Sequence, residues 1–201
     1  MFEHIERIWT DLDNPLCNNL RKSIEVIENA VRIFDTNQLA ISFNGGKDAT
    51  VVLHLVRYVF FKLNILDTLG TTAPIIYFDD PKTFPEMTEF LIEIKSQYNL
   101  QYTTYDCSFK DGVMDMTGKR GVKAIFMGVR EGDPHAAGAE HMHPSSRSWP
   151  AFMRVYPILT WTHSDVWTFL KACHVPYCTL YDRGYTSIGL THNTIPHPAL
   201  R

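Results

Sequence analysis

The segment SFNGGKD, residues 42–48, combines residue types that proteins use to hold anions. It follows an apolar run and precedes an amphipathic pattern, which together predict a strand, a turn and a helix. Glycines let main-chain N–H groups approach phosphate oxygens, a helix N-terminus favours negative charge, and Lys47 adds a cation. Asp48 would repel an anion unless a divalent cation or a nearby base offsets its charge. The segment therefore predicts a site for a magnesium–nucleotide complex.

Two common phosphate loops are excluded by spacing. A Walker A loop needs Gly at position 41 and Ser or Thr at position 48, where this chain has Ile41 and Asp48, and a G-x-G-x-x-G dinucleotide motif is absent as well. A purely structural interpretation stays open. In it, Gly45 and Gly46 supply positive φ angles for a turn, and Asp48 caps the next helix.

The composition is that of a globular protein without general affinity for nucleic acid. The chain has 201 residues, of which 45% are hydrophobic and 20% charged, and this predicts one domain with a sizeable core. Its net charge of -3 gives no electrostatic attraction to nucleic acid. No apolar run reaches the roughly 18 residues of a membrane span, the first residues lack a secretory pattern, and the four cysteines form no C-x-x-C pair. We therefore expect a cytoplasmic monomer that binds neither nucleic acid nor membrane.

Alternating helix and strand patterns must position the glycine-containing segment. Helical spacing of apolar residues predicts helices over 16–35, after Asp48 and from Pro85, with a weaker signal over 110–121, and apolar runs predict strands over 39–43, 74–78, 100–105 and 124–129. This order predicts an α/β fold, a doubly wound and mostly parallel sheet with helices on both faces. Ligands of such sheets bind at the carboxyl ends of the strands, where residues 42–48 would lie.

The C-terminal part is expected to be rich in loops. Residues 130–150 are irregular, and long loops inside a domain are usually functional or disordered. Residues 162–165 resemble a capping box that begins a helix. The chain from residue 175 onward is predicted to be mostly loop. Three histidines, His135, His141 and His143, lack the partners of a metal site and are best explained as solvated loop residues. The expected organisation is a helical segment over 1–37, a nucleotide-binding core over 38–129 and a loop-rich C-terminal part over 130–201.

Several of these segments resemble those of a known family, and the resemblance implies that residues 130–201 bind a flavin. SFNGGKD resembles the S-x-G-G-K-D-S loop of the ATP pyrophosphatase superfamily, which includes the PAPS reductases and grips the pyrophosphate of ATP while the α-phosphate is attacked. Within that superfamily, residues 84–90 (FPEMTEF), 128–134 (GVREGDP), 149–167 and 175–200 are similar to eukaryotic FAD synthases. The resemblance implies an adenine nucleotide alpha hydrolase-like fold and the reaction of ATP with FMN to give FAD and pyrophosphate, with Mg²⁺ as cofactor.

The resemblance also implies roles for residues around the nucleotide. The loop from Asn44 to Asp48 would hold the departing pyrophosphate, with Asp48 orienting magnesium, and the main chains of Phe78 and Val129 would contact adenine. Arg130 would meet the charge that develops in transfer, and Asp133 would bind flavin phosphate groups or magnesium; the alternative for both is a local ion pair that fixes the turn. The implied catalytic residues are Asn44, Asp48, Arg130 and Asp133, and the implied nucleotide-binding residues are Ile41, Ser42, Phe43, Gly45, Gly46, Lys47, Phe78 and Val129.

The flavin would be bound by the C-terminal part. Trp149 would flank the isoalloxazine ring, whereas Phe152 reads better as core filling, and Arg154 and Arg183 would contact phosphates unless they are merely solvated. Ser146 stands where the family commonly has an acidic residue three positions before the tryptophan, so flavin affinity is expected to differ.

Three other functions stay open. A PAPS reductase would need a cysteine in a Glu-Cys-Gly-x-His setting, and Cys178 is followed by Thr179 instead. A sulfate adenylyltransferase would release pyrophosphate with sulfate and without FMN. A flavin-binding module without turnover would bind FMN and make no FAD.

Overall fold

The structure, a computed structural model, describes residues 1–134 and 136–200. Within these residues six strands form one sheet in the order β3-β2-β1-β4-β6-β5. All neighbouring strands are parallel except β5 and β6, which pair antiparallel at the edge. The strands are β1 (Leu39–Ser42), β2 (Ile75–Phe78), β3 (Tyr102–Tyr105), β4 (Ala124–Phe126), β5 (Met142–Pro144) and β6 (Met153–Val155).

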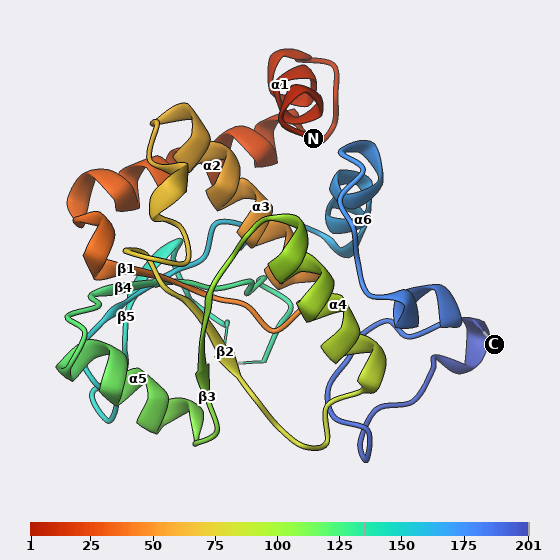
Figure 1. The fold of residues 1–201 in the computed structure, drawn as a ribbon. Coiled ribbons are helices and arrows are strands. Elements are labelled where there is room, and N and C mark those ends of the chain that lie inside the picture. Colours follow the sequence, from red (N-terminus) through yellow and green to blue (C-terminus); the bar gives the residue numbers. More distant parts are fainter. Residues whose placement is uncertain (135, 201) are drawn as a thin grey trace.

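Helices cover the two faces of this sheet unequally (Figure 1). The larger buried cluster joins one face to five helices, α1 (Phe2–Thr10), α2 (Cys17–Ile33), α3 (Lys47–Lys62), α4 (Pro85–Gln97) and α6 (His163–Ala172). The opposite face is covered by α5 (Phe109–Gly118) through a smaller cluster. Short 3₁₀ helices lie at η1 (Thr36–Gln38), η2 (Leu66–Thr68), η3 (Thr179–Arg183) and η4 (Pro198–Leu200).

Strand β1 lies at the centre because both of its faces are apolar. Leu39 and Ile41 are fully buried in the larger cluster, and Ala40 between them is fully buried in the smaller one. Successive side chains of a strand point to opposite faces, so a continuous apolar run suits a strand covered on both sides. The glycine-containing segment leaves this central strand at its carboxyl end.

The structure confirms the predicted α/β class and most of the predicted elements. Pro85 begins α4, and Thr162 and Asp165 form the predicted capping box of α6, with hydrogen bonds of 3.1 and 2.8 Å. The strand predicted over 124–129 ends at Phe126, because the chain turns at Val129, whose N–H donates to Met127 O at 3.0 Å.

The prediction that residues 130–150 are irregular throughout is wrong at one point, because β5 lies within them. Strand β6 and helix α1 were not individually predicted either. Strands β5 and β6 have three residues each, which is too few to show an alternating pattern. Across the part of the chain that the structure describes, no helix has the length and apolar character that crossing a membrane requires.

Candidate active site

The glycine-containing turn joins β1 to α3 with one left-handed residue. Gly45 has φ +78°, and a Cβ there would collide with Met87 Sδ, so only glycine fits. Gly46 has an ordinary φ of -61° and precedes the first helical residue, Lys47. The turn therefore needs positive φ at Gly45 alone, and the suggestion that Gly46 supplies it too is wrong.

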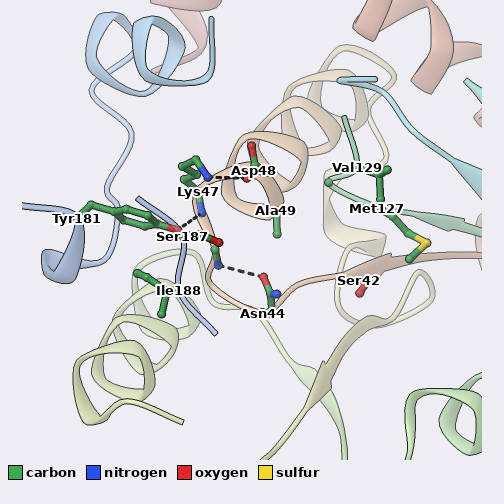
Figure 2. A pocket seen from close by; sticks show the side chains of 12 residues that line it. Ser42, Asn44, Lys47, Asp48, Ala49, Met127, Val129, Tyr181, Ser187 and Ile188 are labelled. Atoms are coloured by element: carbon green, nitrogen blue, oxygen red, sulfur yellow. Dashed lines mark hydrogen bonds and ion pairs between the residues drawn. The ribbon is translucent and has the colours of Figure 1, made fainter. Parts of the chain in front are cut away.

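A cavity of about 250 Å³, the glycine-loop cavity, lies between this turn and the chain that follows β4 (Figure 2). Strand β1 has β2 and β3 on one side and β4 on the other, so the cavity lies where the strand order reverses, as predicted. Its lining residues are Ser42, Asn44, Gly46, Lys47, Asp48, Ala49, Met127, Gly128, Val129, Tyr181, Ser187 and Ile188.

Two cations and one carboxylate meet beside this cavity. Lys47 Nζ lies 3.0 Å from Asp48 Oδ2, and Arg130 Nε lies 2.8 Å from Asp48 Oδ1. The second contact is an ion pair without an aligned hydrogen bond, since both of its atoms are buried and have no hydrogen-bond partner among the described residues. Arg130 also pairs with Asp133, whose Oδ1 lies 3.8 Å from Arg130 Nη2, so these four side chains together carry no net charge. Burial lowers the pKa of His163, and the charges of Lys47 and Arg130 lower it further. An anionic ligand would have to compete with Asp48 and Asp133 for the two cations.

Gly128 lets the chain after β4 pass against the first turn of α3. A Cβ at Gly128 would lie 2.7 Å from Ala49 N. This close approach brings Arg130 within reach of Asp48.

Asp133 holds the turn that carries Arg130. Its Oδ2 accepts a hydrogen bond from the main-chain N–H of Arg130 at 2.8 Å, and its own N–H donates to Arg130 O at 2.9 Å. Its Oδ1 lies 3.8 Å from Arg130 Nη2. These contacts agree with the alternative interpretation of Asp133 as a residue that fixes the turn.

Tyr181 contributes an unpredicted polar group to the cavity. Its hydroxyl oxygen accepts a hydrogen bond of 2.9 Å from the main-chain N–H of Lys47 (Figure 2). Tyr181 lies in η3, 134 residues further along the chain. Spacing could not have revealed it, and the only available signal was its place within residues 175–200.

A second cavity of about 360 Å³, the strand-end cavity, opens at the carboxyl ends of β1 and β2. It shares Ser42, Asn44 and Ile188 with the glycine-loop cavity. Phe78 lines it and packs on Tyr105, with ring centroids 5.5 Å apart. Its other lining residues are largely apolar: Phe43, Ile76, Tyr77, Asp80, Thr83, Met87, Phe109, Gly189 and Leu190.

A third cavity of about 560 Å³, the aromatic cavity, lies beside β6 and the start of α5. It shares Met127 and Val129 with the glycine-loop cavity, so the two meet at the turn after β4. Trp149 lines it with its ring 5.8 Å from that of Phe109. Its lining residues are Phe109, Met127, Val129, Pro134, His143, Ser146, Trp149, Phe152, Arg154 and Tyr156.

Within this cavity the predicted residues differ in exposure and partners. Phe152 is only 6% exposed and belongs to the smaller core cluster, which agrees with core filling. Arg154 Nη2 lies 3.5 Å from Ser146 Oγ, at the limit of a hydrogen bond. His143, opposite Arg154 in the β5–β6 register, adds a second basic side chain that was not predicted at this site.

Some predicted residues lie outside the three cavities. Ile41 is fully buried in the sheet core. Arg183 is largely exposed and donates to Glu86 Oε1 at 2.6 Å, and it lines none of these cavities.

The histidines of the long loop do not form a metal site in the described residues. His141 Nδ1 lies 2.8 Å from Tyr156 O, and His143 faces the aromatic cavity. His135 lies outside the described residues. Among residues 1–134 and 136–200, no three or more His, Cys, Asp or Glu side chains gather in a way that could hold a metal ion.

Comparison with known proteins identifies the family. A model of the phosphoadenosine phosphosulfate reductase domain matches residues 38–120 and 111–196. A probable FAD synthase from Caenorhabditis elegans is 39% identical over 90% of this chain and 35% of its own length. A probable FAD synthase from Schizosaccharomyces pombe is 35% identical over 99% of this chain and 81% of its own length. The chain thus spans about a third of the nematode relative and most of the yeast one.

The fold is also shared with a solved structure. Candida glabrata FMN adenylyltransferase, in complex with FAD and inorganic pyrophosphate, superposes with a TM-score of 0.85 over 98% of this chain and 72% of that chain, at 25% sequence identity. The chain therefore belongs to the phosphoadenosine phosphosulfate reductase domain family and, within it, to the eukaryotic FAD synthases.

Proposed function

We propose that this chain transfers the AMP moiety of ATP to the phosphate of FMN, giving FAD and pyrophosphate. One observation carries the proposal: the cavity lined by the glycine-containing turn and Lys47 shares lining residues with two further cavities, whose walls are largely apolar or aromatic. FAD itself consists of two ring systems joined through a diphosphate. The Candida glabrata relative, solved with FAD and pyrophosphate, supports the same pair of products.

The three cavities suggest one subsite for each part of the reactants. The strand-end cavity, with Phe78 in its wall, would take adenine; Val129 lines the other two cavities and not this one, so in this arrangement it would not contact adenine as expected. The glycine-loop cavity would hold the phosphates of ATP. The aromatic cavity would take the isoalloxazine ring against Trp149, because aromatic faces bury large planar ligands well. The FMN phosphate and the α-phosphate of ATP would then meet beside Val129, which lines both of the latter cavities.

The chemistry is in-line displacement at the α-phosphorus. An oxygen of the FMN phosphate forms the new P–O bond, the bond from the α-phosphorus to the bridging oxygen breaks, and pyrophosphate leaves. Catalysis of this kind is mostly positioning and neutralisation of charge. Lys47 and Arg130 already lie beside the cavity, paired with Asp48, and we propose that they exchange part of that pairing for phosphate oxygens.

Magnesium would be held by Asp48 together with the phosphates. Asp48 Oδ1 accepts no aligned hydrogen bond within the described residues, but it lies 2.8 Å from Arg130 Nε, so Arg130 would have to turn toward a phosphate before this oxygen could bind the ion. Magnesium at nucleotide sites typically binds one or two carboxylates and substrate phosphates, which this single carboxylate satisfies. When bound, the ion would neutralise phosphate charge. Removal of magnesium by a chelator should abolish FAD formation and leave the fold intact.

The cysteines do not favour the reductase alternative. Cys173 and Cys178 are buried, and burial raises the pKa of Cys178 and raises that of Cys173 to about 12. Thiols with a raised pKa are poor nucleophiles at neutral pH.

Free cysteines are typical of proteins in reducing compartments, so we propose a cytoplasmic location, which cell fractionation would test. We also propose that the protein is a monomer in solution, which light scattering would test.

The deciding experiment mixes the protein with ATP, FMN and magnesium and measures FAD by chromatography. Formation of FAD with equimolar pyrophosphate is expected. Binding of FMN without FAD would instead support the flavin-binding module. Sulfate-dependent release of pyrophosphate without FMN would support a sulfate adenylyltransferase.

A further inference from the structure

Two main-chain donors of the glycine-containing turn are already used by the protein itself. Gly46 N–H donates to Asn44 Oδ1 at 3.0 Å, and Lys47 N–H donates to Tyr181 Oη at 2.9 Å (Figure 2). The expectation that the loop from Asn44 to Asp48 holds pyrophosphate therefore needs a change at these two amides. To use them, a ligand must either displace the two side chains or bind through them.

The Tyr181 hydroxyl still has its own proton to donate. A phenolic hydroxyl has one donor and can also accept, and this oxygen accepts from Lys47 while its hydrogen has no acceptor among the described residues. Burial raises the pKa of Tyr181, and the nearby Asp48 charge raises it as well, so the proton is present at neutral pH. The group faces the cavity that holds Lys47 and Asp48.

The ring of Tyr181 is held in place by its neighbours. It contacts Trp167 edge-on with centroids 5.3 Å apart and Tyr177 with centroids 6.5 Å apart. Lys47 Nζ lies 5.9 Å from its centroid. Because the neighbouring rings fix this position, displacing the side chain would break several contacts at once, and binding through the hydroxyl would break none.

We infer that the Tyr181 hydroxyl binds the departing pyrophosphate of the proposed reaction, accepting from the Lys47 N–H and donating its own hydrogen to a phosphate oxygen. This inference rests on the proposed function of the cavity as the phosphate site. The hydroxyl extends the turn, so that the Lys47 amide acts on the anion through Tyr181. The hydroxyl is neutral, so it adds no positive charge to the site. It should therefore bind pyrophosphate less tightly than a further cation would, which favours release of the product.

The test compares Tyr181→Phe with wild type in the binding of inorganic pyrophosphate with magnesium, by isothermal titration calorimetry. Loss of a hydrogen bond to a charged group should weaken binding about tenfold. The matched control is Tyr177→Phe, in the same aromatic cluster, whose hydroxyl donates to Asp182 Oδ1 at 3.1 Å instead. That control should change pyrophosphate affinity less than about twofold, and both variants should keep wild-type FMN affinity, because neither ring lines the aromatic cavity.

The opposite result is equally clear. If Tyr181 only caps the Lys47 amide, its removal frees that amide for the anion, and pyrophosphate affinity would stay unchanged or rise while the unfolding temperature falls. Either of those affinities would overturn the inference. A different measurement tests the proposed function itself: if the wild-type protein makes no FAD, that function is wrong, whatever the two variants do to pyrophosphate binding.

Discussion

The glycine-loop cavity and the aromatic cavity are built on opposite principles. The first takes most of its walls from two short stretches, residues 42–49 and 127–129, and it contains the ion pair of Lys47 with Asp48. The second takes its walls from scattered positions between Phe109 and Tyr156, and rings dominate them. Buried charges act strongly on developing charge, whereas rings mainly contribute contact area.

This difference predicts which kinetic parameter a substitution in each cavity will change. Changes in the glycine-loop cavity should lower the turnover number if, as we propose, its charges act while pyrophosphate leaves. Changes in the aromatic cavity should raise the KM for FMN and leave turnover nearly unchanged, since they remove binding energy that the ground state and transition state share. Each substitution below tests one side of this division.

Asp48→Asn should have the largest effect. The amide keeps the shape of the side chain but removes the charge that pairs Lys47 and Arg130 and the proposed magnesium ligand. FAD formation should fall about a hundredfold or more, measured by chromatography, with circular dichroism showing that the variant is folded.

Asp133→Asn is the matched control. Its amide oxygen can still accept from the Arg130 N–H, so the turn should survive and activity should fall less than about tenfold. Wild-type activity in Asp48→Asn would remove this carboxylate from the mechanism, and an equal loss in both variants would show that turn geometry dominates.

Arg130→Gln should lower turnover about a hundredfold with little change in the KM for FMN. The side chain is 16% exposed and lies beside Asp48, and it follows Val129, which lines both cavities. Steady-state kinetics with FMN varied at saturating ATP would separate the two parameters. An unchanged turnover number with a raised KM would place Arg130 on the binding side of the comparison.

Half of the residues that line the glycine-loop cavity were named from the sequence, because local rules govern that part of it: Ser42, Asn44, Gly46, Lys47, Asp48 and Val129. An apolar strand, a glycine turn and an amphipathic helix fix Lys47 and Asp48, and alternating elements bring the turn after β4 beside them. Tyr181 escaped because it lies in a tail without periodic pattern, and no local rule connects it to a turn 134 residues earlier.

The aromatic cavity was less predictable from sequence. Ser146, Trp149 and Arg154 were named through the resemblance, and the structure places all three in one cavity. His143 faces the same cavity because β5 pairs antiparallel with β6, opposite Arg154. Three-residue strands carry too few side chains to show alternation, so that pairing could not be read from the chain.

Gly128→Ala should test whether backbone proximity, rather than charge alone, builds the glycine-loop cavity. The new methyl group would lie 2.7 Å from Ala49 N, and main-chain atoms cannot rotate away as a side chain can. The free energy of unfolding should fall by about 1–3 kcal/mol, measured by urea denaturation, and turnover should fall with it. Gly132→Ala, where a Cβ meets no atom within 4 Å, should change neither.

Arg154→Gln should have the smallest effect, and it should change the KM for FMN and not the turnover number. Arg154 lines the aromatic cavity at Ser146, where the carboxylate common in the family is replaced by a hydroxyl, so its charge is not neutralised there. A basic side chain in that position can donate to the acceptor-rich edge of a flavin, and its loss should raise the KM for FMN about tenfold with turnover within twofold of wild type. Arg147→Gln, an exposed arginine that does not line this cavity, supplies the control and should change neither parameter. A fall in turnover without a change in KM would mean that Arg154 acts on the phosphates, and the division between a charged catalytic cavity and a binding cavity would then fail.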